Sequence, residues 1–248
     1  MKRSMASYRA VPDLTSDSAL DLYAKVEDLL GVKEAAPDLY TYYFNFLETV
    51  DFNSLLDIGC GSGDFLLQVR EKFAPRGLAG IDLSPLMVEQ GRKKGLDVQH
   101  VNLCDLDRSF EVITAVFDML NYLSRRELIK FLHCVEDRVK EGGYFLCDIN
   151  TLYGFEEVAV GSFIVDDDNR FLTIDSDFDG DTYESEFTLF EKRGEECFGK
   201  SSGIIRQYYH TADEIDRLLP GMSLLNEEGV TLYGDEADKH FLVFQKGL

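Results

Sequence analysis

The chain has 248 residues, 45% of them apolar, enough to bury one substantial core. Its 46 acidic residues outnumber its 25 basic ones, which gives a formal net charge of −21. A surface of that sign repels phosphate polyanions and anionic lipids, so we expect neither nucleic acid nor a membrane as a partner. The chain has no long apolar run for a membrane span and no signal peptide at its start, which predicts a cytoplasmic protein.

The five cysteines lie far apart and mostly within apolar runs. They form no CxxC pair and have no histidine neighbours at the spacing of metal ligands. We therefore expect no metal site and interpret all five as reduced packing residues. They are Cys60, Cys104, Cys134, Cys147 and Cys197.

Apolar spacing predicts two helices before residue 50, over 16–30 and 37–49, and a lid is one role open to them. From residue 53 onward, short apolar runs alternate with amphipathic stretches, a pattern typical of a parallel sheet with right-handed helical crossovers. The predicted strands are 54–58, 78–82, 97–101, 111–117 and 143–149, and the predicted helices are 64–73, 84–94 and 124–140.

Beyond Asn150 the pattern changes to strands separated by hairpin signals such as Asp179-Gly180. The predicted strands here are 161–166, 170–178, 182–192 and 197–209. A last helix over 211–219 and a hairpin of strands 223–232 and 240–245 follow, the hairpin at the sheet's edge. The expected fold is α/β, a doubly wound, mostly parallel seven-stranded sheet with an antiparallel insertion after the fifth strand. The expected units are N-terminal helices 1–50, a main domain of 51–150 with 211–248, and a substrate cap of 151–210.

Three glycines follow the first strand at two-residue spacing, at positions 59, 61 and 63. Glycine adopts positive φ angles and lets a ligand approach the main chain, and ligands of doubly wound sheets bind at the carboxyl ends of strands. A dinucleotide fingerprint would read GxGxxG, but the spacing here is GxGxG. Asp57, just upstream, would oppose a pyrophosphate and suit an ammonium group. Structural turns also use glycine, so the triplet is not specific alone.

Asp82 closes the second predicted strand, where a carboxylate can accept both hydroxyls of a ribose. The alternative is that Asp82 caps the next helix, a role that Ser84 makes redundant.

Five segments in this order resemble the class I S-adenosylmethionine-dependent methyltransferases. They are "LLDIGCGSGDF", "GIDLSPLMVEQGRKKG", "VNLCDL", "AVFDMLNYL" and "KEGGYFLCDINT". The resemblance covers nearly everything from residue 37 to 248. The motifs "FDMLNYL" and "DINT" look like a bacterial subgroup of small-molecule methyltransferases, similar in layout to amino-sugar and glycine N-methyltransferases.

The resemblance implies S-adenosylmethionine as the methyl donor and a set of donor contacts at the ends of the first four strands. Asp57 would support the amino-acid end and Asp82 the ribose, while Leu83 would lie against the adenine. Asn102 stands where the family often has an aspartate for the adenine amino group, which leaves Asp105 as an alternative. The implied set is Asp57, Gly59, Cys60, Gly61, Gly63, Asp82, Leu83, Asn102, Leu103, Phe117 and Asp118.

The acceptor side follows from the resemblance and from the insertion. Methyl transfer needs alignment and exclusion of water, and a hydroxyl acceptor also needs a base. The predicted catalytic residues are His210, Asp118 and Tyr122, and the predicted substrate contacts are Asn121, Tyr122, Tyr153, Arg206 and Tyr208. Two alternatives remain open: Asn121 belongs to the N-terminal turn of the next helix, and the tyrosines of the insertion pack one face of its sheet onto the core.

The sequence thus predicts transfer of a methyl group to an N or O atom of a small molecule by a monomer or homodimer. One alternative is a sensor or scaffold that binds S-adenosylmethionine without catalysis. Another is a nicotinamide-dependent oxidoreductase, which the glycine spacing disfavours.

Overall fold

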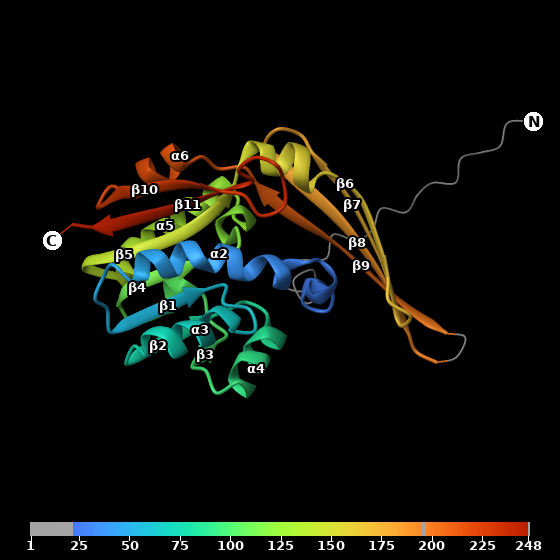
Figure 1. The fold of residues 1–248 in the computed structure, drawn as a ribbon, viewed down its shortest axis with the longest axis horizontal. Coiled ribbons are helices and arrows are strands. Elements are labelled where there is room, and N and C mark those ends of the chain that lie inside the picture. The colour runs from blue at the N-terminus through green and yellow to red at the C-terminus, as the bar shows by residue number, and fades with distance from the viewer. Residues whose placement is uncertain (1–21, 195–196, 248) are drawn as a thin grey trace, which may run out of the picture.

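A computed structural model describes residues 22–194 and 197–247, and these residues form two sheets (Figure 1). Sheet A has seven strands in the order β10-β11-β5-β4-β1-β2-β3. Its strands are β1 (Ser54–Ile58), β2 (Gly77–Ile81), β3 (Val98–Gln99), β4 (Phe110–Ala115), β5 (Val139–Asn150), β10 (Met222–Val230) and β11 (Lys239–Lys246). The first five pair in parallel, whereas β11 runs antiparallel to β5 and to β10. The predicted fold class is confirmed.

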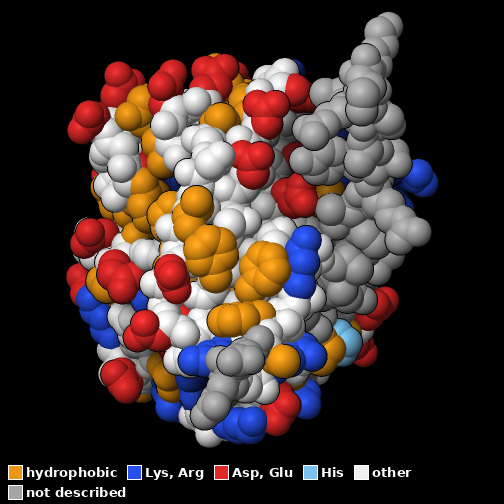
Figure 2. All heavy atoms as spheres, turned by 90° about the vertical axis from the view of Figure 1, so that its right-hand side faces the viewer, with side chains coloured by type: hydrophobic (Ala, Val, Ile, Leu, Met, Phe, Trp, Pro, Cys, Tyr) orange, Lys and Arg blue, Asp and Glu red, His pale blue; other side chains and the backbone are white. Residues whose placement is uncertain are grey.

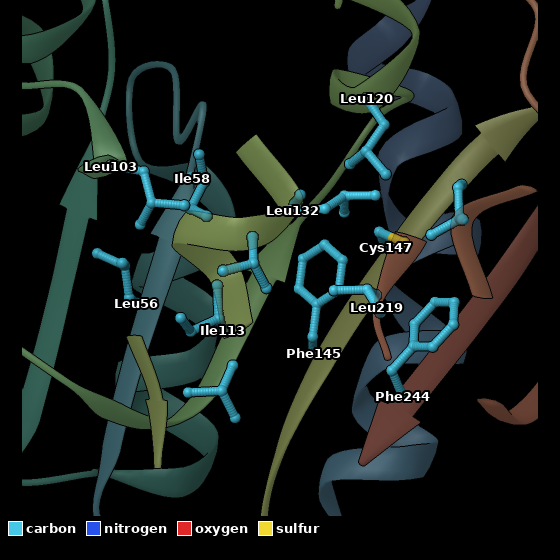
Figure 3. Close-up of a cluster of buried hydrophobic side chains, with 14 of the residues drawn as sticks. Leu56, Ile58, Leu103, Ile113, Leu120, Leu132, Phe145, Cys147, Leu219 and Phe244 are labelled. Atoms are coloured by element: carbon cyan, nitrogen blue, oxygen red, sulfur yellow. The ribbon is translucent and has the colours of Figure 1, made fainter. Parts of the chain in front are cut away.

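Helices cover both faces of sheet A. The first face carries α2 (Val32–Leu47), α3 (Asp64–Phe73) and α4 (Pro85–Lys93). The second carries α5 (Arg125–Arg138) and α6 (Ala212–Leu218), whose apolar side chains meet Ile113, Phe145 and Phe244 of the strands (Figure 3). Burial of these two apolar layers is the main force that holds the parallel strands together.

The helix starts follow their capping residues. The Ser84 hydroxyl accepts a hydrogen bond from the Met87 N–H, and Pro85 occupies the first helical position of α4. Ser124 and Glu127 form a capping box at the start of α5. These local signals explain why the predicted helices 84–94 and 124–140 agree closely with α4 and α5.

The N-terminal predictions need correction. Helix α2 begins at Val32 rather than at 37, and Pro37 lies inside it. Buried Leu39, Tyr40 and Tyr43 anchor the helix against the sheet, and this packing outweighs the proline. Of the predicted helix 16–30, residues 16–21 lie outside the described residues. From 22 to 30 the chain forms a short helical turn and the 3-10 helix η1 (Glu27–Leu29), not a continuous helix.

Sheet B consists of four antiparallel strands in the order β6-β7-β8-β9 and extends away from the carboxyl edge of sheet A (Figure 1). Its strands are β6 (Gly161–Asp166), β7 (Arg170–Phe178), β8 (Thr182–Lys192) and β9 (Phe198–Tyr208). A π-helical turn, η4 (Gly154–Ala159), precedes them. The antiparallel insertion is therefore present as predicted.

The two faces of sheet B differ. One face buries Leu172, Phe187 and Leu189 against Leu22 and Val26 of the N-terminal segment. Elsewhere sheet B exposes large apolar side chains, and Figure 2, which views this side of the molecule, shows apolar groups gathered among charged ones. The exposed members on sheet B are Phe163, Ile164, Phe171 and Phe198.

One sequence-based expectation about cysteine is wrong. Cys104 and Cys134 are joined by a disulfide that links the short 3-10 helix η2 (Leu103–Asp105) to α5. Their 30-residue separation in sequence hides a proximity that only the packing of α5 beside η2 creates. Cys60 and Cys147 are free and buried, and Cys197 is free and exposed.

Candidate functional site

The turn between β1 and α3 places main chain at the carboxyl edge of sheet A. Gly59, Gly61 and Gly63 have φ angles of 66°, 52° and 84°, the left-handed region that favours glycine. A Cβ on Gly59 would lie 2.8 Å from Met119 Cγ, and one on Gly63 would lie 2.3 Å from Leu96 Cδ1. A Cβ on Gly61 would meet nothing within 4 Å. Only Gly61 thus faces open space, while the other two glycines allow close packing.

Asp82 follows β2 and braces this turn. Its carboxylate accepts hydrogen bonds from the Gly61 N–H at 2.8 Å and from the Ser84 N–H at 2.8 Å. Burial raises the pKa of Asp82, although these N–H donors act in the opposite direction. Leu83, the next residue, is apolar yet 47% exposed. A hydrogen-bonding carboxylate and an exposed apolar side chain thus stand together beside the open main chain at Gly61.

Asp57 lies beneath the same turn, within β1. It is buried and accepts a hydrogen bond from the Thr114 hydroxyl at 2.7 Å. Burial raises its pKa from 3.8 to about 8, and the negative charges of Asp82 and Asp148 add to the effect. Near neutral pH, the charge of the Asp57 carboxyl group therefore depends on the charges around it.

The predicted adenine contacts lie after β3. The Asn102 side-chain oxygen accepts a hydrogen bond from the Cys104 N–H at 3.0 Å and so caps η2. The Leu103 side chain is buried in the core between sheet A and α5. Asn102 therefore has a structural task, which leaves its second lone pair for a ligand.

The corner after β4 is strained. Phe117 and Asp118 are consecutive non-glycine residues with φ angles of 59° and 47°. The Asp148 carboxylate accepts hydrogen bonds from both of their N–H groups, each at 2.8 Å. Asp148 is fully buried and also accepts the Tyr43 hydroxyl at 2.6 Å. This carboxylate holds the strained corner in place.

The Asp118 side chain is held separately. One of its oxygens accepts a hydrogen bond from Lys239 Nζ at the start of β11, and the other accepts one from Gln207 Nε2 near the end of β9. Sequence reasoning missed Lys239, Gln207 and Asp148. The only signal for any of them was the acid in the apolar run "GYFLCDIN", since Asp148 interrupts it.

Asn121 and Tyr122 occupy η3 (Met119–Tyr122), directly after this corner. The Asn121 amide donates to the Tyr208 carbonyl at 2.8 Å and accepts the Asn150 N–H at 3.0 Å. Its side chain is fully buried and ties sheet B to sheet A. Tyr122 packs against the buried face of sheet B.

His210 lies elsewhere. It is 3% exposed, its Nε2 lies 2.9 Å from the Leu123 carbonyl oxygen, and burial lowers its pKa. His210 and Tyr153 line a cavity of about 440 Å³ whose lining includes no residue of the glycine turn or the strained corner. The structure therefore gives no contact in favour of His210 as a base. Arg206 pairs with Glu184 on sheet B.

The described residues form neither a metal-ion cluster nor a membrane-spanning helix. Among residues 22–194 and 197–247, no three or more His, Cys, Asp or Glu side chains are grouped to hold a metal ion. Within the same ranges, no helix has the length and apolar character needed to cross a membrane.

Comparison with known proteins shows what this chain is similar to. Residues 55–143 match the family model described as a methyltransferase domain. Among solved structures, a S-adenosylmethionine-dependent methyltransferase from Clostridium acetobutylicum ATCC 824 is similar with a TM-score of 0.73 at 21% identity, over 93% of this chain and 98% of that one. The sugar N-methyltransferase KedS8 from Streptoalloteichus sp ATCC 53650 is similar with a TM-score of 0.70 at 19% identity, over 100% of both chains. The fold is thus the Rossmann-like fold of S-adenosylmethionine-dependent methyltransferases.

Curated relatives match part of this chain. Aklanonic acid methyltransferase DauC of Streptomyces sp. (strain C5) is 29% identical over 113 residues, 41% of this chain and 51% of the relative. The putative methyltransferase YqeM of Bacillus subtilis (strain 168) is 27% identical over 135 residues, 51% of this chain and 54% of the relative. The chain therefore spans about half the length of the curated relatives that it matches.

Proposed function

We propose that this protein transfers a methyl group from S-adenosylmethionine to an N or O atom of a small molecule. The observation that carries the proposal is the open main chain at Gly61, with the Asp82 carboxylate and exposed Leu83 beside it. An adenosine needs a partner for its ribose hydroxyls and an apolar surface for its base, and these residues supply both. The methyltransferase domain match and the fold support the same proposal.

The charges around the site suit this donor. Asp57, Asp82, Asp118 and Asp148 surround the carboxyl ends of β1, β2, β4 and β5, with Lys239 as the cation among them. An acidic environment favours a ligand that carries an ammonium group and a positively charged sulfur. When bound, the donor would supply a methyl group activated by that sulfur.

The protein's task in such a transfer is alignment and exclusion of water, because no covalent intermediate is required. In the proposal, Gly61 and Asp82 hold the donor, and the Phe117–Asp118 corner lies between donor and acceptor. Sheet B and residues 22–30, which pack on each other, cover the acceptor side. Asp118 is the carboxylate at this corner that would accept a hydrogen bond from the acceptor's N–H or O–H group.

The proposal is tested by calorimetric titration with S-adenosylhomocysteine. Asp82→Ala should weaken binding by about 1–3 kcal/mol, because buried ribose hydrogen bonds are lost. Asp97→Ala, which removes an exposed carboxylate near β3, is the matched control and should bind as the wild type does.

Unchanged affinity of Asp82→Ala, or preference of the wild type for NAD, would contradict the proposal. Turnover is then measured with labelled donor and a panel of small amines and alcohols. Tight donor binding without turnover on any acceptor would instead favour a sensor or scaffold.

A further inference from the structure

Lys239 is an unusually buried cation at the first residue of β11. Its side chain is 4% exposed. Among the ion pairs of the described residues, the next most buried lysine or arginine is Lys246 at 18%. Burying an ammonium is costly unless opposite charges and hydrogen bonds compensate for the lost water. A lysine at this position therefore needs strong partners.

Lys239 has three partners from two segments, the corner after β4 and the end of β5. Its ammonium donates to an Asp118 carboxylate oxygen, donates to the Asn150 side-chain oxygen at 2.7 Å, and lies 3.6 Å from an Asp148 oxygen. Asp118 belongs to the strained corner, and Asp148 holds the backbone of that corner. A single cation thus contacts both carboxylates that define the corner.

The pKa of Lys239 and the pKa of Asp148 each depend on the charge of the other residue. Burial raises the pKa of Asp148, and Lys239 is the largest influence that opposes this rise. Burial alone would lower the pKa of Lys239, but Asp118 and Asp148 outweigh it and the pKa is raised. The ammonium therefore stays charged at neutral pH and offsets the repulsion between the two carboxylates.

Asp118 is fixed at both oxygens by side chains from distant strands. Gln207 of β9 holds one oxygen while Lys239 of β11 holds the other. Its backbone, with a φ angle of 47°, is held by Asp148. Such a conformation persists only where surrounding contacts over-determine it, which is typical of functional sites.

We infer that Lys239 is a positioning residue for methyl transfer, because it fixes the Asp118 carboxylate and the Phe117–Asp118 corner between the donor seat and sheet B. This inference rests on the proposed function. Lys239 acts through Asp118 and Asp148 and does not touch the reacting atoms.

The test compares S-adenosylhomocysteine affinity among variants of the full chain. Lys239→Met removes the charge and keeps an apolar stem, and affinity should fall about tenfold or more because the corner loses its cation. Lys239→Arg retains the charge and should restore most of the affinity. Lys246→Met is the matched control: Lys246 lies at the other end of β11 and donates to the Glu136 and Val139 carbonyls. It should bind as the wild type does.

A double-mutant cycle separates positioning from general stability. Because Lys239 acts partly through Asp118, Lys239→Met should lower affinity clearly less in the Asp118→Asn protein than in the wild type. Thermal unfolding of each variant shows whether it is folded. If Lys239→Met does not fold, the other two variants test the inference. Asp118→Asn must then lose affinity for S-adenosylhomocysteine, and Lys239→Arg must keep it.

Wild-type affinity in Lys239→Met, or full additivity in the cycle, would overturn the inference while leaving the proposed function intact. A wild-type protein that binds no S-adenosylhomocysteine would remove the proposed function and this inference together.

Discussion

The proposed donor side and the proposed acceptor side of the site are built in different ways. On the donor side, open main chain at Gly61 and the carboxylate of Asp82 come from one β-α-β unit. On the acceptor side, Asp118 is held by Gln207 and Lys239, which are 89 and 121 residues away in sequence. The first half depends on backbone conformation and the second on charged side chains brought together by the fold. Substitutions should therefore affect the two halves differently.

The largest expected effect concerns the cross-link on the donor side. The Cys104–Cys134 disulfide closes a loop with a sequence separation of 30, and a bridge of that size contributes about 3–4 kcal/mol to stability. Cys134→Ser should lower the free energy of unfolding by that amount in urea titrations. Cys197→Ser, which changes an exposed free thiol near β9, should have no effect. Equal melting temperatures of the wild type with and without reductant would contradict the cross-link.

Two glycines on the donor side should give distinct results. Gly63→Ala forces a φ angle of 84° on a residue with a Cβ and presses that atom against Leu96, so stability should fall by about 1–3 kcal/mol. Gly61→Ala has room for its Cβ, so only the strain of its φ angle of 52° remains, and it should cost about 1–2 kcal/mol. Its added methyl group would nevertheless occupy the proposed donor seat.

Urea unfolding and calorimetry should therefore show Gly61→Ala to be the better folded variant and a poor binder of S-adenosylhomocysteine. Wild-type affinity in a folded Gly61→Ala protein would break the view that the donor rests on bare main chain.

A smaller effect is expected from pH. The folded-state pKa of Asp57, about 8, lies above its usual value of 3.8, so the folded protein retains a proton that the unfolded chain releases. Stability from this group is present at low pH and is lost as pH rises through about 8. Near pH 6–7 the loss should approach about 1 kcal/mol per pH unit.

Asp57→Asn should flatten this dependence, measured as the free energy of unfolding at several pH values. If Asp57→Asn and the wild type lose stability with equal slopes, burial of Asp57 does not control its protonation.

The sequence predicts the elements well where local signals are strong. The ranges 64–73, 161–166, 170–178 and 182–192 agree with α3, β6, β7 and β8, because alternation, helical spacing and turn residues are local properties. The residues proposed to hold the donor could be named for the same reason: glycines and acids at the ends of strands lie close together in sequence. The sequence does not show which of the three glycines faces open space, because that depends on the packing of Met119 and Leu96.

The contacts that hold Asp118 could not be predicted from the sequence. Lys239 reads as one charged residue before an apolar strand, and Gln207 as a polar residue within a hairpin. Their shared contact with Asp118 exists because β11 runs antiparallel to β5 and β9 returns to η3. The Cys104–Cys134 disulfide could not be predicted for a similar reason. Contacts between distant segments have no periodic signal in a single sequence.

The most direct test is a crystal structure of the protein with S-adenosylhomocysteine. We expect its ribose hydroxyls within hydrogen-bonding distance of the Asp82 carboxylate, its base against Leu83, and its amino-acid end over Gly61 toward the Phe117–Asp118 corner. Density for the ligand at any other place, or none at saturating concentration, would contradict the central claim that this turn is a donor seat.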